Sequence, residues 1–217
     1  MVTLGAYQPR PFPGLHFFNR MVSSDTFVIL DDFQFKRQRW QQRYEVWMHD
    51  HPHRLTIPID HSTLFKPINE VRTTDGKWRE EHLKTLKQCY GRDPFFDRYY
   101  TLAELCLKHV QLSCISLTFI EHIINELNID TDIVYSSTLD IKSKATDYLV
   151  EMCKTLNADT YLCGGTAYHS YMELDKFEKA GIEVKVQRWK CHYKPYGDIS
   201  IIDPLMRYGR EAKQWIQ

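Results

Sequence analysis

The segment from residue 131 to residue 187 alternates short apolar runs with longer amphipathic stretches, and this alternation restricts the fold more than any other feature. Strands are predicted at 133–135, 160–163 and 182–187, and helices at 144–157 and 171–180. The connections between these elements are short, which favours parallel strands joined by right-handed crossovers. We therefore expect an α/β fold, with a parallel or mostly parallel sheet flanked by helices.

The rest of the chain adds two strands before this segment and a helical region in the middle. Residues 3–7 and the apolar run 27–30 are predicted strands, separated by a helix at 16–22. A continuously apolar strand is typical of a sheet that is covered on both faces. Further predicted elements are hairpin strands at 44–48 and 54–59 with a turn at 49–53, a helix at 78–90, one or two helices over 102–127, and a last helix at 200–215. The lack of clear core strands after residue 60 predicts a helical insertion or layer over roughly 76–128.

Length and charge place the chain among ordinary soluble proteins. With 217 residues, a single domain spanning 1–217 is expected. The 28 Lys and Arg residues are balanced by 28 Asp and Glu residues, which argues against strong non-specific binding to duplex DNA or to an anionic membrane. A local basic cleft is compatible with this balance, so nucleic acid stays a less favoured partner, and no membrane partner is expected.

Cysteine usage and the apolar segments indicate a cytoplasmic protein. The six cysteines include no Cys-x-x-Cys pair, and most lie in helix-like sequence, so we expect reduced thiols. No signal peptide is evident at the N-terminus. The longest apolar segment, 112–124, contains Ser, Glu and His, and it is too short and too polar to span a bilayer.

Unusual polar side chains are concentrated between Gln8 and Arg43. A Pro-rich loop at 8–16 joins the first strand to the first helix. Further polar residues follow the buried second strand: Asp31, Asp32, Lys36, Arg37, Arg39 and Arg43. Open α/β sheets form ligand crevices where buried strands deliver polar groups at their carboxyl ends. This segment therefore predicts a site for a charged small molecule.

Taken in order along the chain, many of these residues match a recognisable pattern. The matching text is Gln8-Pro9, Pro13, Phe17-Phe18, Ser24-Asp25, Phe27-Val28, Asp31 to Lys36, Arg43, Leu55 to Pro58, Trp78, His82, Tyr90, Ser136-Ser137, Tyr161, Gly164-Gly165, Tyr171, Phe177, Gly181-Ile182, Ser200 to Asp203 and Gly209. The chain thereby resembles the WbqC-like family, found among genes for O-antigen and other surface-polysaccharide synthesis. The resemblance covers nearly the whole chain.

This resemblance implies a transferase-like role in modifying amino sugars or similar activated molecules, for example by joining an amino acid to one. The chain departs from the family pattern within the expected site. Pro11 and Gly14 stand near the early prolines where the family usually has a tyrosine and a tryptophan, and Tyr44 replaces an asparagine. These departures leave open whether the substrate is that of the polysaccharide relatives.

The candidates for catalysis are Asp32, His82 and His16. Asp32 would act as a base toward an amine, and neighbouring carboxylates would also suit Mg²⁺, so the cofactor stays open. His16 would donate to a phosphate oxygen at the start of a helix. His82 would carry a proton. Each histidine also has a structural interpretation: His16 as a surface residue of a rigid turn, and His82 as a satisfied core histidine.

Candidates for substrate binding come from both halves of the chain. They are Gln8, Lys36, Arg43, Ser137, Gly164, Gly165 and Tyr168. Lys36 and Arg43 would hold a phosphate, since guanidinium binds such groups through two hydrogen bonds, although a solvated basic loop is an alternative. Small residues at the ends of parallel strands, such as Gly164, let backbone N–H groups approach a ligand.

Three further features are assigned no role in catalysis or metal binding. His49, His51 and His53 have a spacing that could present three imidazoles from one strand face, but Pro52 and the turn-like composition argue against a strand there, so no metal site is assigned. Cys163 lacks an identifiable histidine partner and is expected to be a small buried residue. An aspartate that precedes a proline near the start of the last helix, Asp203, is expected to cap that helix.

We therefore expect a transferase that joins an amino acid or another amine to a phosphate- or nucleotide-activated sugar or similar small molecule. One alternative is an enzyme that transfers an amino acid to an activated nucleobase, for instance within DNA. A second alternative is a non-catalytic binding protein. The enzymatic interpretation assumes that the loop at 8–16 and the strand ends near residues 32, 136 and 164 converge on one polar cavity.

Overall fold

The computed structural model describes residues 1–37, 39–170, 172–194 and 199–217. These residues divide into two units, and each unit is built from three stretches of chain. The sheet unit comprises 1–7, 19–30 and 130–190, and the helical unit comprises 8–18, 31–129 and 191–217. The expectation that 1–217 acts as one domain stays a prediction.

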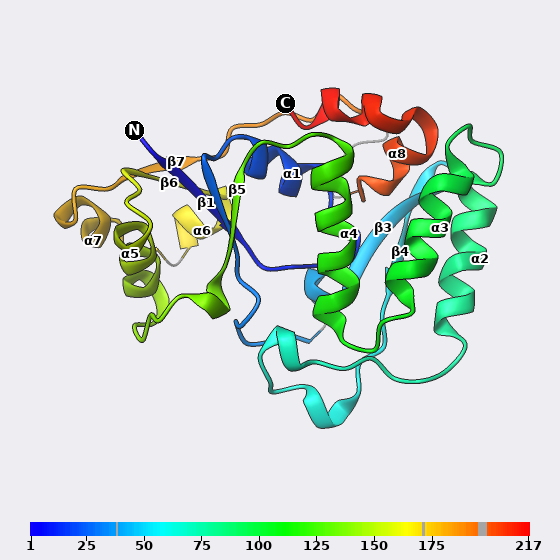
Figure 1. Cartoon of the computed structure of the whole chain (residues 1–217), viewed down its shortest axis with the longest axis horizontal. Coiled ribbons are helices and arrows are strands. Elements are labelled where there is room, and N and C mark those ends of the chain that lie inside the picture. Colours follow the sequence, from blue (N-terminus) through cyan, green and yellow to red (C-terminus); the bar gives the residue numbers. More distant parts are fainter. Residues whose placement is uncertain (38, 171, 195–198) are drawn as a thin grey trace. The chain divides into compact units, whose positions relative to one another are not determined.

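A parallel sheet is the core of the sheet unit (Figure 1). Within the described residues, its five strands are β1 (Thr3–Tyr7), β2 (Thr26–Ile29), β5 (Asp132–Tyr135), β6 (Thr160–Cys163) and β7 (Glu183–Val186). The strand order is β5-β2-β1-β6-β7, and each neighbouring pair runs parallel. The predicted α/β class with a parallel sheet is therefore confirmed.

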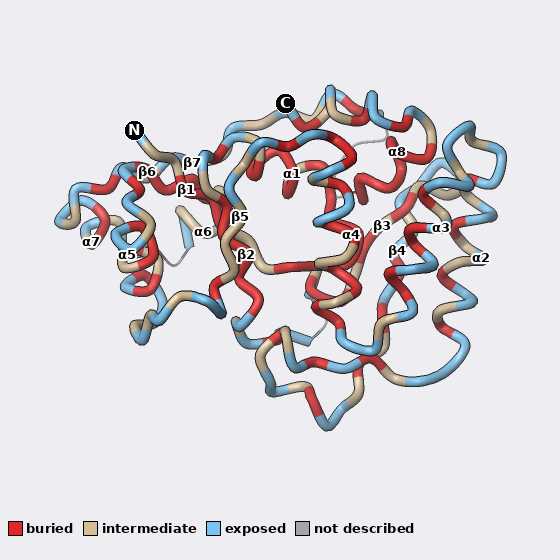
Figure 2. Tube along the Cα trace, in the orientation of Figure 1, coloured by how far each residue is buried: buried red, intermediate tan, exposed pale blue. Residues whose placement is uncertain are grey.

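Helices connect these strands. They are α1 (Leu15–Val22), whose second half belongs to the sheet unit, α5 (Ala145–Thr155), α6 (Gly165–Ser170) and α7 (Leu174–Lys179), with a 3₁₀ turn, η4 (Ser136–Thr138), after β5. The single helix predicted at 171–180 corresponds to α7 alone, and α6 was not predicted. Tyr171 lies outside the described residues. The central strands are mostly buried, whereas the edge strand β7 alternates between exposed and half-buried residues (Figure 2).

The order of the strands reverses between β1 and β6, which makes the sheet doubly wound. Right-handed crossovers then place α1 and α7 on opposite faces. Side-chain contacts agree with this placement, because Gly5 and Tyr161 face opposite ways in the β1–β6 register. Tyr161 stacks on Phe177 of α7 with ring centroids 5.5 Å apart, while a Cβ on Gly5 would lie 2.3 Å from the hydroxyl of Ser24, which follows α1.

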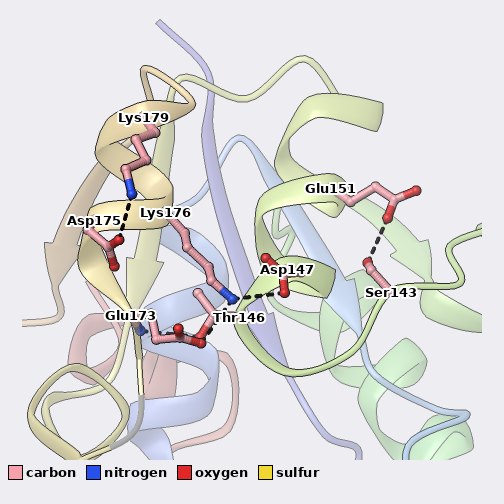
Figure 3. A network of polar contacts seen from close by, with 8 residues as sticks. All are labelled: Ser143, Thr146, Asp147, Glu151, Glu173, Asp175, Lys176 and Lys179. Carbon is pink, nitrogen blue, oxygen red and sulfur yellow. Dashed lines mark hydrogen bonds and ion pairs between the residues drawn. The ribbon is translucent and has the colours of Figure 1, made fainter.

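Polar side chains connect α5 to α7 at the surface of the sheet unit (Figure 3). Nζ of Lys176 lies 2.8 Å from Oδ2 of Asp147 and 3.1 Å from Oε1 of Glu173. The backbone N–H of Glu173 also donates to the hydroxyl of Thr146 at 3.2 Å. Exposed ion pairs contribute at most about 1 kcal/mol each, so this network orients α7 more than it stabilises the unit.

The helical unit consists of a hairpin, helices and short 3₁₀ segments (Figure 1). Its elements are η1 (Trp40–Gln42), β3 (Arg43–Met48), β4 (His51–Thr56), η2 (His61–Thr63), η3 (Ile68–Glu70), α2 (Trp78–Tyr90), α3 (Phe96–Leu107), α4 (Leu112–Glu126), α8 (Ile202–Tyr208) and η5 (Gly209–Trp215). The predicted helix at 78–90 is α2, and the sequence at 102–127 contributes to two helices, α3 and α4. Helix α3 packs against both α2 and α4, and α2 also contacts β3. The expected helical insertion in the middle of the chain is confirmed.

The hairpin has a shorter turn than predicted. Met48 pairs with His51, so His49 and Asp50 form a two-residue turn with φ values of 49° and 61°, typical of a type I′ turn. Pro52 consequently lies inside β4, which corrects the prediction of a turn over 49–53. A proline is tolerated there because, among the residues described, β4 has β3 as its one neighbouring strand, and its other edge needs no ladder hydrogen bonds.

The last helix also differs from its prediction. It divides at Gly209, whose φ of 58° ends α8 and begins η5. The carboxylate of Asp203 does not cap α8. It is fully buried and accepts hydrogen bonds from the hydroxyls of Tyr90 (2.7 Å) and Tyr193, and it pairs with Nε of Arg207 at 3.1 Å. Asp203 therefore connects α8 to α2 and to the segment before α8.

Candidate functional site

The carboxyl ends of β1 and β6 flank the point where the strand order reverses. Ligands of open α/β sheets bind outside the carboxyl ends of the strands at such a switch point. The structure brings Gly164 and Gly165 to this point, directly after β6. Ser137 follows β5, which β2 and β1 separate from β6, so its strand lies about 14 Å from β6 at the usual strand spacing. Of these candidates, the glycines lie at the switch point and Ser137 lies at an edge of the sheet.

A buried arginine that the sequence analysis did not single out occupies the switch point. Arg20, in the last turn of α1, is 8% exposed, and its Nε and Nη2 donate to Oε1 of Gln187 at 3.1 and 2.9 Å. Nη1 donates to the carbonyl of Ala6 at 3.3 Å, and the guanidinium lies 4.7 Å from the ring centre of Tyr7. Gln187 in turn donates to Oδ1 of Asn19 at 2.6 Å. These contacts hold the guanidinium firmly at the carboxyl end of β1.

The two candidate glycines have different surroundings. A Cβ on Gly164 would lie 2.7 Å from Nη2 of Arg20, whereas a Cβ on Gly165 would find its nearest neighbour, on Val186, at 3.9 Å. The space above Gly164 is therefore taken by the arginine, and space remains only at Gly165. Tyr168, on the short helix α6, donates its backbone N–H to the carbonyl of Gly164 at 3.1 Å.

The thiol of Cys163 has the surroundings of a core residue. Its side chain is buried at the end of β6, and desolvation raises the pKa of the thiol, although the nearby charge of Arg20 opposes this shift. A thiol with a raised pKa is a poor nucleophile. All six cysteines are free thiols, as expected, and burial raises the pKa values of Cys106 and Cys153 to about 12.

The Pro-rich loop is a buried part of the helical unit. Residues 9–15 are all buried, and the ring of Phe12 contacts the rings of Tyr44 and Phe119 at centroid distances of 4.6 and 4.9 Å. Phe12 has a φ of 43°, in the left-handed region that costs a bulky residue free energy. Surrounding packing therefore fixes the conformation of this loop.

The imidazole of His16 contacts a second buried arginine, which the sequence analysis also missed. Nη2 of Arg10 lies 2.6 Å from Nε2 and 3.3 Å from Nδ1 of His16, and its guanidinium lies 5.7 Å from the ring centre of Trp40. A guanidinium can only donate, so the nitrogen of His16 that meets it is an acceptor. In this arrangement Nε2 of His16 cannot donate to a phosphate, and Arg10 is the charged donor of the loop.

Gln8 and Lys36 are brought together by a residue with no sequence signal of its own. Nε2 of Gln41 donates to Oε1 of Gln8 at 2.7 Å, and the backbone N–H of Lys36 donates to Oε1 of Gln41 at 2.5 Å. The side chain of Lys36 is exposed. Gln41 therefore ties the loop after Asp32 to the start of the Pro-rich loop.

The two aspartates after β2 differ in accessibility. Asp31 is buried, and its carbonyl accepts from the backbone N–H of Asn69 at 3.0 Å, while Asp32 is exposed. Asp32 is therefore the carboxylate that a substrate can reach. Arg43 begins β3, opposite Thr56 in the register of the hairpin, and it is half-buried.

His82 lies in the core of the helical unit. It is 4% exposed, its Nδ1 lies 3.0 Å from the hydroxyl of Tyr44, and its ring meets the edge of Trp78 at 5.2 Å. Burial lowers the pKa of His82 from 6.5 to about 4, although a hydrogen bond with the backbone of Thr56 partly opposes this shift. A neutral, hydrogen-bonded histidine fits the structural interpretation better than that of a proton carrier.

Across 1–37, 39–170, 172–194 and 199–217, no three His, Cys, Asp or Glu side chains gather as the ligands of a cation. The described residues thus offer no set of carboxylates arranged to hold Mg²⁺. None of the helices in the described ranges has the length and apolar character needed to cross a bilayer.

Together, these features define an α/β protein with a doubly wound parallel sheet and a buried arginine at its switch point. The sequence model of the WbqC-like protein family matches residues 8–215, so the chain belongs to this family, as its sequence pattern indicates. The chain is also similar to the uncharacterized protein Rv1507c of Mycobacterium tuberculosis (strain ATCC 25618 / H37Rv). The two are 24% identical over 232 residues, which cover 100% of this chain and 98% of that protein.

Proposed function

We propose that the protein is a transferase that joins an amino acid or another amine to a phosphate- or nucleotide-activated sugar or similar small molecule. The observation that carries this proposal is the switch point between β1 and β6. Doubly wound sheets bind nucleotides and other phosphate-bearing ligands at this place. The chain belongs to the WbqC-like family, and the family resemblance implies a role in modifying activated amino sugars or similar molecules. Gly165 and Tyr168 lie at this end of the sheet, and we assign them to ligand contacts.

Apart from this sheet end, the helical unit contains candidate groups of its own for the reaction. In the proposed scheme, Lys36 and Arg43 bind the phosphate of the activated substrate, and Asp32 accepts a proton. The amine nitrogen attacks the carbon that carries the phosphate, and a C–N bond forms as the C–O bond breaks. The electron pair of that bond leaves with the phosphate, and the surplus proton of the amine passes to Asp32. His82 has no part in this scheme, because it is buried against Tyr44.

Binding and turnover of nucleotide sugars test the proposal. The purified chain is titrated calorimetrically with a panel of nucleotide sugars, then incubated with each sugar and a mixture of amino acids, and products are detected by mass spectrometry. We expect Arg43→Ala to weaken binding by about tenfold or more, as for loss of a charged hydrogen bond. Asp32→Asn should retain binding and lose product formation.

A matched control and two contradicting outcomes complete this experiment. Arg92 is an exposed arginine of the same unit, and Arg92→Ala should bind like the wild type. A wild-type protein that binds no nucleotide-linked ligand at millimolar concentration would contradict the proposal. Full turnover by Asp32→Asn would contradict the role of that carboxylate.

A further inference from the structure

A hydrogen-bonded relay in the helical unit ends at Gln8. It begins at the backbone N–H of Lys36, which donates to Oε1 of Gln41 at 2.5 Å, and continues from Nε2 of Gln41 to Oε1 of Gln8 at 2.7 Å. Gln41 is 4% exposed, so little water competes for its amide. Gln8 is half-buried and follows β1 directly. The relay therefore joins a fixed backbone group to a side chain at the start of the Pro-rich loop.

The relay has a single direction. A backbone N–H can only donate, so Gln41 must present its oxygen to Lys36. The amide nitrogen of Gln41, which can only donate, then faces Gln8. Gln8 must therefore accept this hydrogen bond with its amide oxygen. The amide nitrogen of Gln8 is left as the group that faces away from Gln41. In the part of the chain that the structure describes, the Gln8 side chain makes no hydrogen bond besides that from Gln41.

We propose that Gln41 is a positioning residue that fixes the side-chain amide of Gln8 as a hydrogen-bond donor, so that the ligand presents an acceptor to Gln8. Suitable acceptors are a carbonyl, a hydroxyl, or a phosphate or ring oxygen. An unfixed glutamine can rotate its amide and accept ligands of either polarity. A fixed one discriminates against a ligand with a donor at that position, by about tenfold or more. This inference rests on the proposed function and adds the chemistry of one contact to it.

The same two hydrogen bonds would also be made if Gln41 only linked the two loops and had no effect on the ligand. The two roles differ in what they require of Gln8. The linking role needs only an oxygen that accepts from Gln41, whereas the positioning role also needs the outward NH₂ group. Gln8→Glu separates them, because a glutamate keeps the accepting oxygen and replaces the outward donor with an acceptor.

Gln41→Glu reverses the relay without removing it. One oxygen of the new carboxylate still accepts from the N–H of Lys36, and the other now requires a donor from Gln8. The Gln8 amide must then rotate and turn its oxygen outward. The side-chain amide protons of Gln8 report this rotation in ¹⁵N NMR spectra of the whole, ligand-free chain. They should exchange rapidly with water in the wild type and slowly in Gln41→Glu. Unchanged exchange in Gln41→Glu, or protected Gln8 protons in the wild type, would overturn the inference.

Ligand binding tests the functional half, with UDP-N-acetylglucosamine as the probe. Gln8→Glu should lower its affinity by about tenfold or more at unchanged melting temperature. Gln41→Glu places a charge at a buried position and should lower the melting temperature, so its affinity, also expected to fall by about tenfold or more, is measured well below the unfolding transition. Gln88→Glu adds the same charge at an exposed position of α2 in the same unit and should bind like the wild type, so it controls for charge alone. Wild-type affinity in both relay variants would overturn the inference. If the wild-type chain binds no nucleotide sugar, the proposed function fails, and the relay itself is still decided by the NMR result.

Discussion

The hydroxyl of Tyr44 lies 3.0 Å from Nδ1 of His82, and both side chains are buried in the helical unit. Burial raises the pKa of Tyr44 well above 10 and lowers that of His82 to about 4, so both groups are neutral near pH 7. Tyr44 also packs on Phe12 of the Pro-rich loop. Tyr44, the residue that departs from the family pattern, therefore packs in the core against this loop.

The protein should become less stable as the pH falls, because His82 is buried in its neutral form. The folded-state pKa of His82, about 4, is below the unfolded value of 6.5, so the unfolded state binds more protons between these values. Stability is thus fully present above about pH 6.5 and is lost as the pH falls toward about 4, by on the order of 3 kcal/mol in total. Urea unfolding of wild type and His82→Gln at several pH values measures this difference. His122→Gln, at an exposed histidine, is the control, and equal pH slopes for wild type and His82→Gln would contradict the prediction.

Alanine should be tolerated at Gly165 and not at Gly164. Gly164→Ala forces its Cβ to within 2.7 Å of Nη2 of Arg20, which Gln187 and Tyr7 hold in place, and we expect a loss of about 1–2 kcal/mol. Gly165→Ala, in a helix with open space, should be neutral or slightly stabilising. Thermal denaturation of both variants and of the double variant Gly164→Ala/Arg20→Lys tests this. If the stability losses of Gly164→Ala and Arg20→Lys simply add in the double variant, contact with Arg20 is not the reason why alanine is rejected at position 164.

Removing the charge of Asp203 should destabilise the helical unit strongly. Its buried carboxylate accepts from two tyrosine hydroxyls and pairs with Arg207. Asp203→Asn replaces one accepting oxygen with a donor and removes the ion pair with Arg207, which keeps only the charge of Asp93, so a loss of about 3 kcal/mol is expected. Tyr193→Phe removes a single hydrogen bond and should cost about 1 kcal/mol. Chemical denaturation compares the two, and equal losses would mean that the charge is not important.

Truncation of Phe12 should cost about 3–5 kcal/mol, since its ring fills the space between Tyr44 and Phe119. Phe12→Leu keeps most of the volume at the same strained φ and serves as the matched variant, with an expected loss below about 2 kcal/mol. Free energies of unfolding from urea titrations measure both. Near-wild-type stability of Phe12→Ala would contradict the view that this ring anchors the loop.

The sequence predicted the individual elements well where their pattern is strong. Residues 3–7, 78–90 and 160–163 form elements with the predicted bounds, because apolar periodicity and flanking polar residues mark them clearly. The turn at 49–53 was wrong because positive φ values at His49 and Asp50 cannot be read from composition. Helix α6 was missed because its six residues are too few to show a helical period.

The candidate site was less accessible to sequence reasoning. Arg20 looks like an ordinary basic residue at the end of a helix, where cations are common, and only the packing of α1 against the sheet brings it to Gly164. Gln41 carries no signal, since its role depends on two hydrogen bonds across a loop. The burial of His82 follows from tertiary packing between α2 and β3 and is invisible in the spacing of Trp78 and His82.

The position of β1 in the sheet has a consequence during synthesis. β1 leaves the ribosome well before one of its two neighbours, β6, is translated. Until then, the nascent β1 has an unsatisfied edge that can pair with the wrong partner, and contacts this distant in sequence form slowly. Slowing translation after residue 163, or supplying a chaperone that holds extended segments, should therefore raise the yield of native protein.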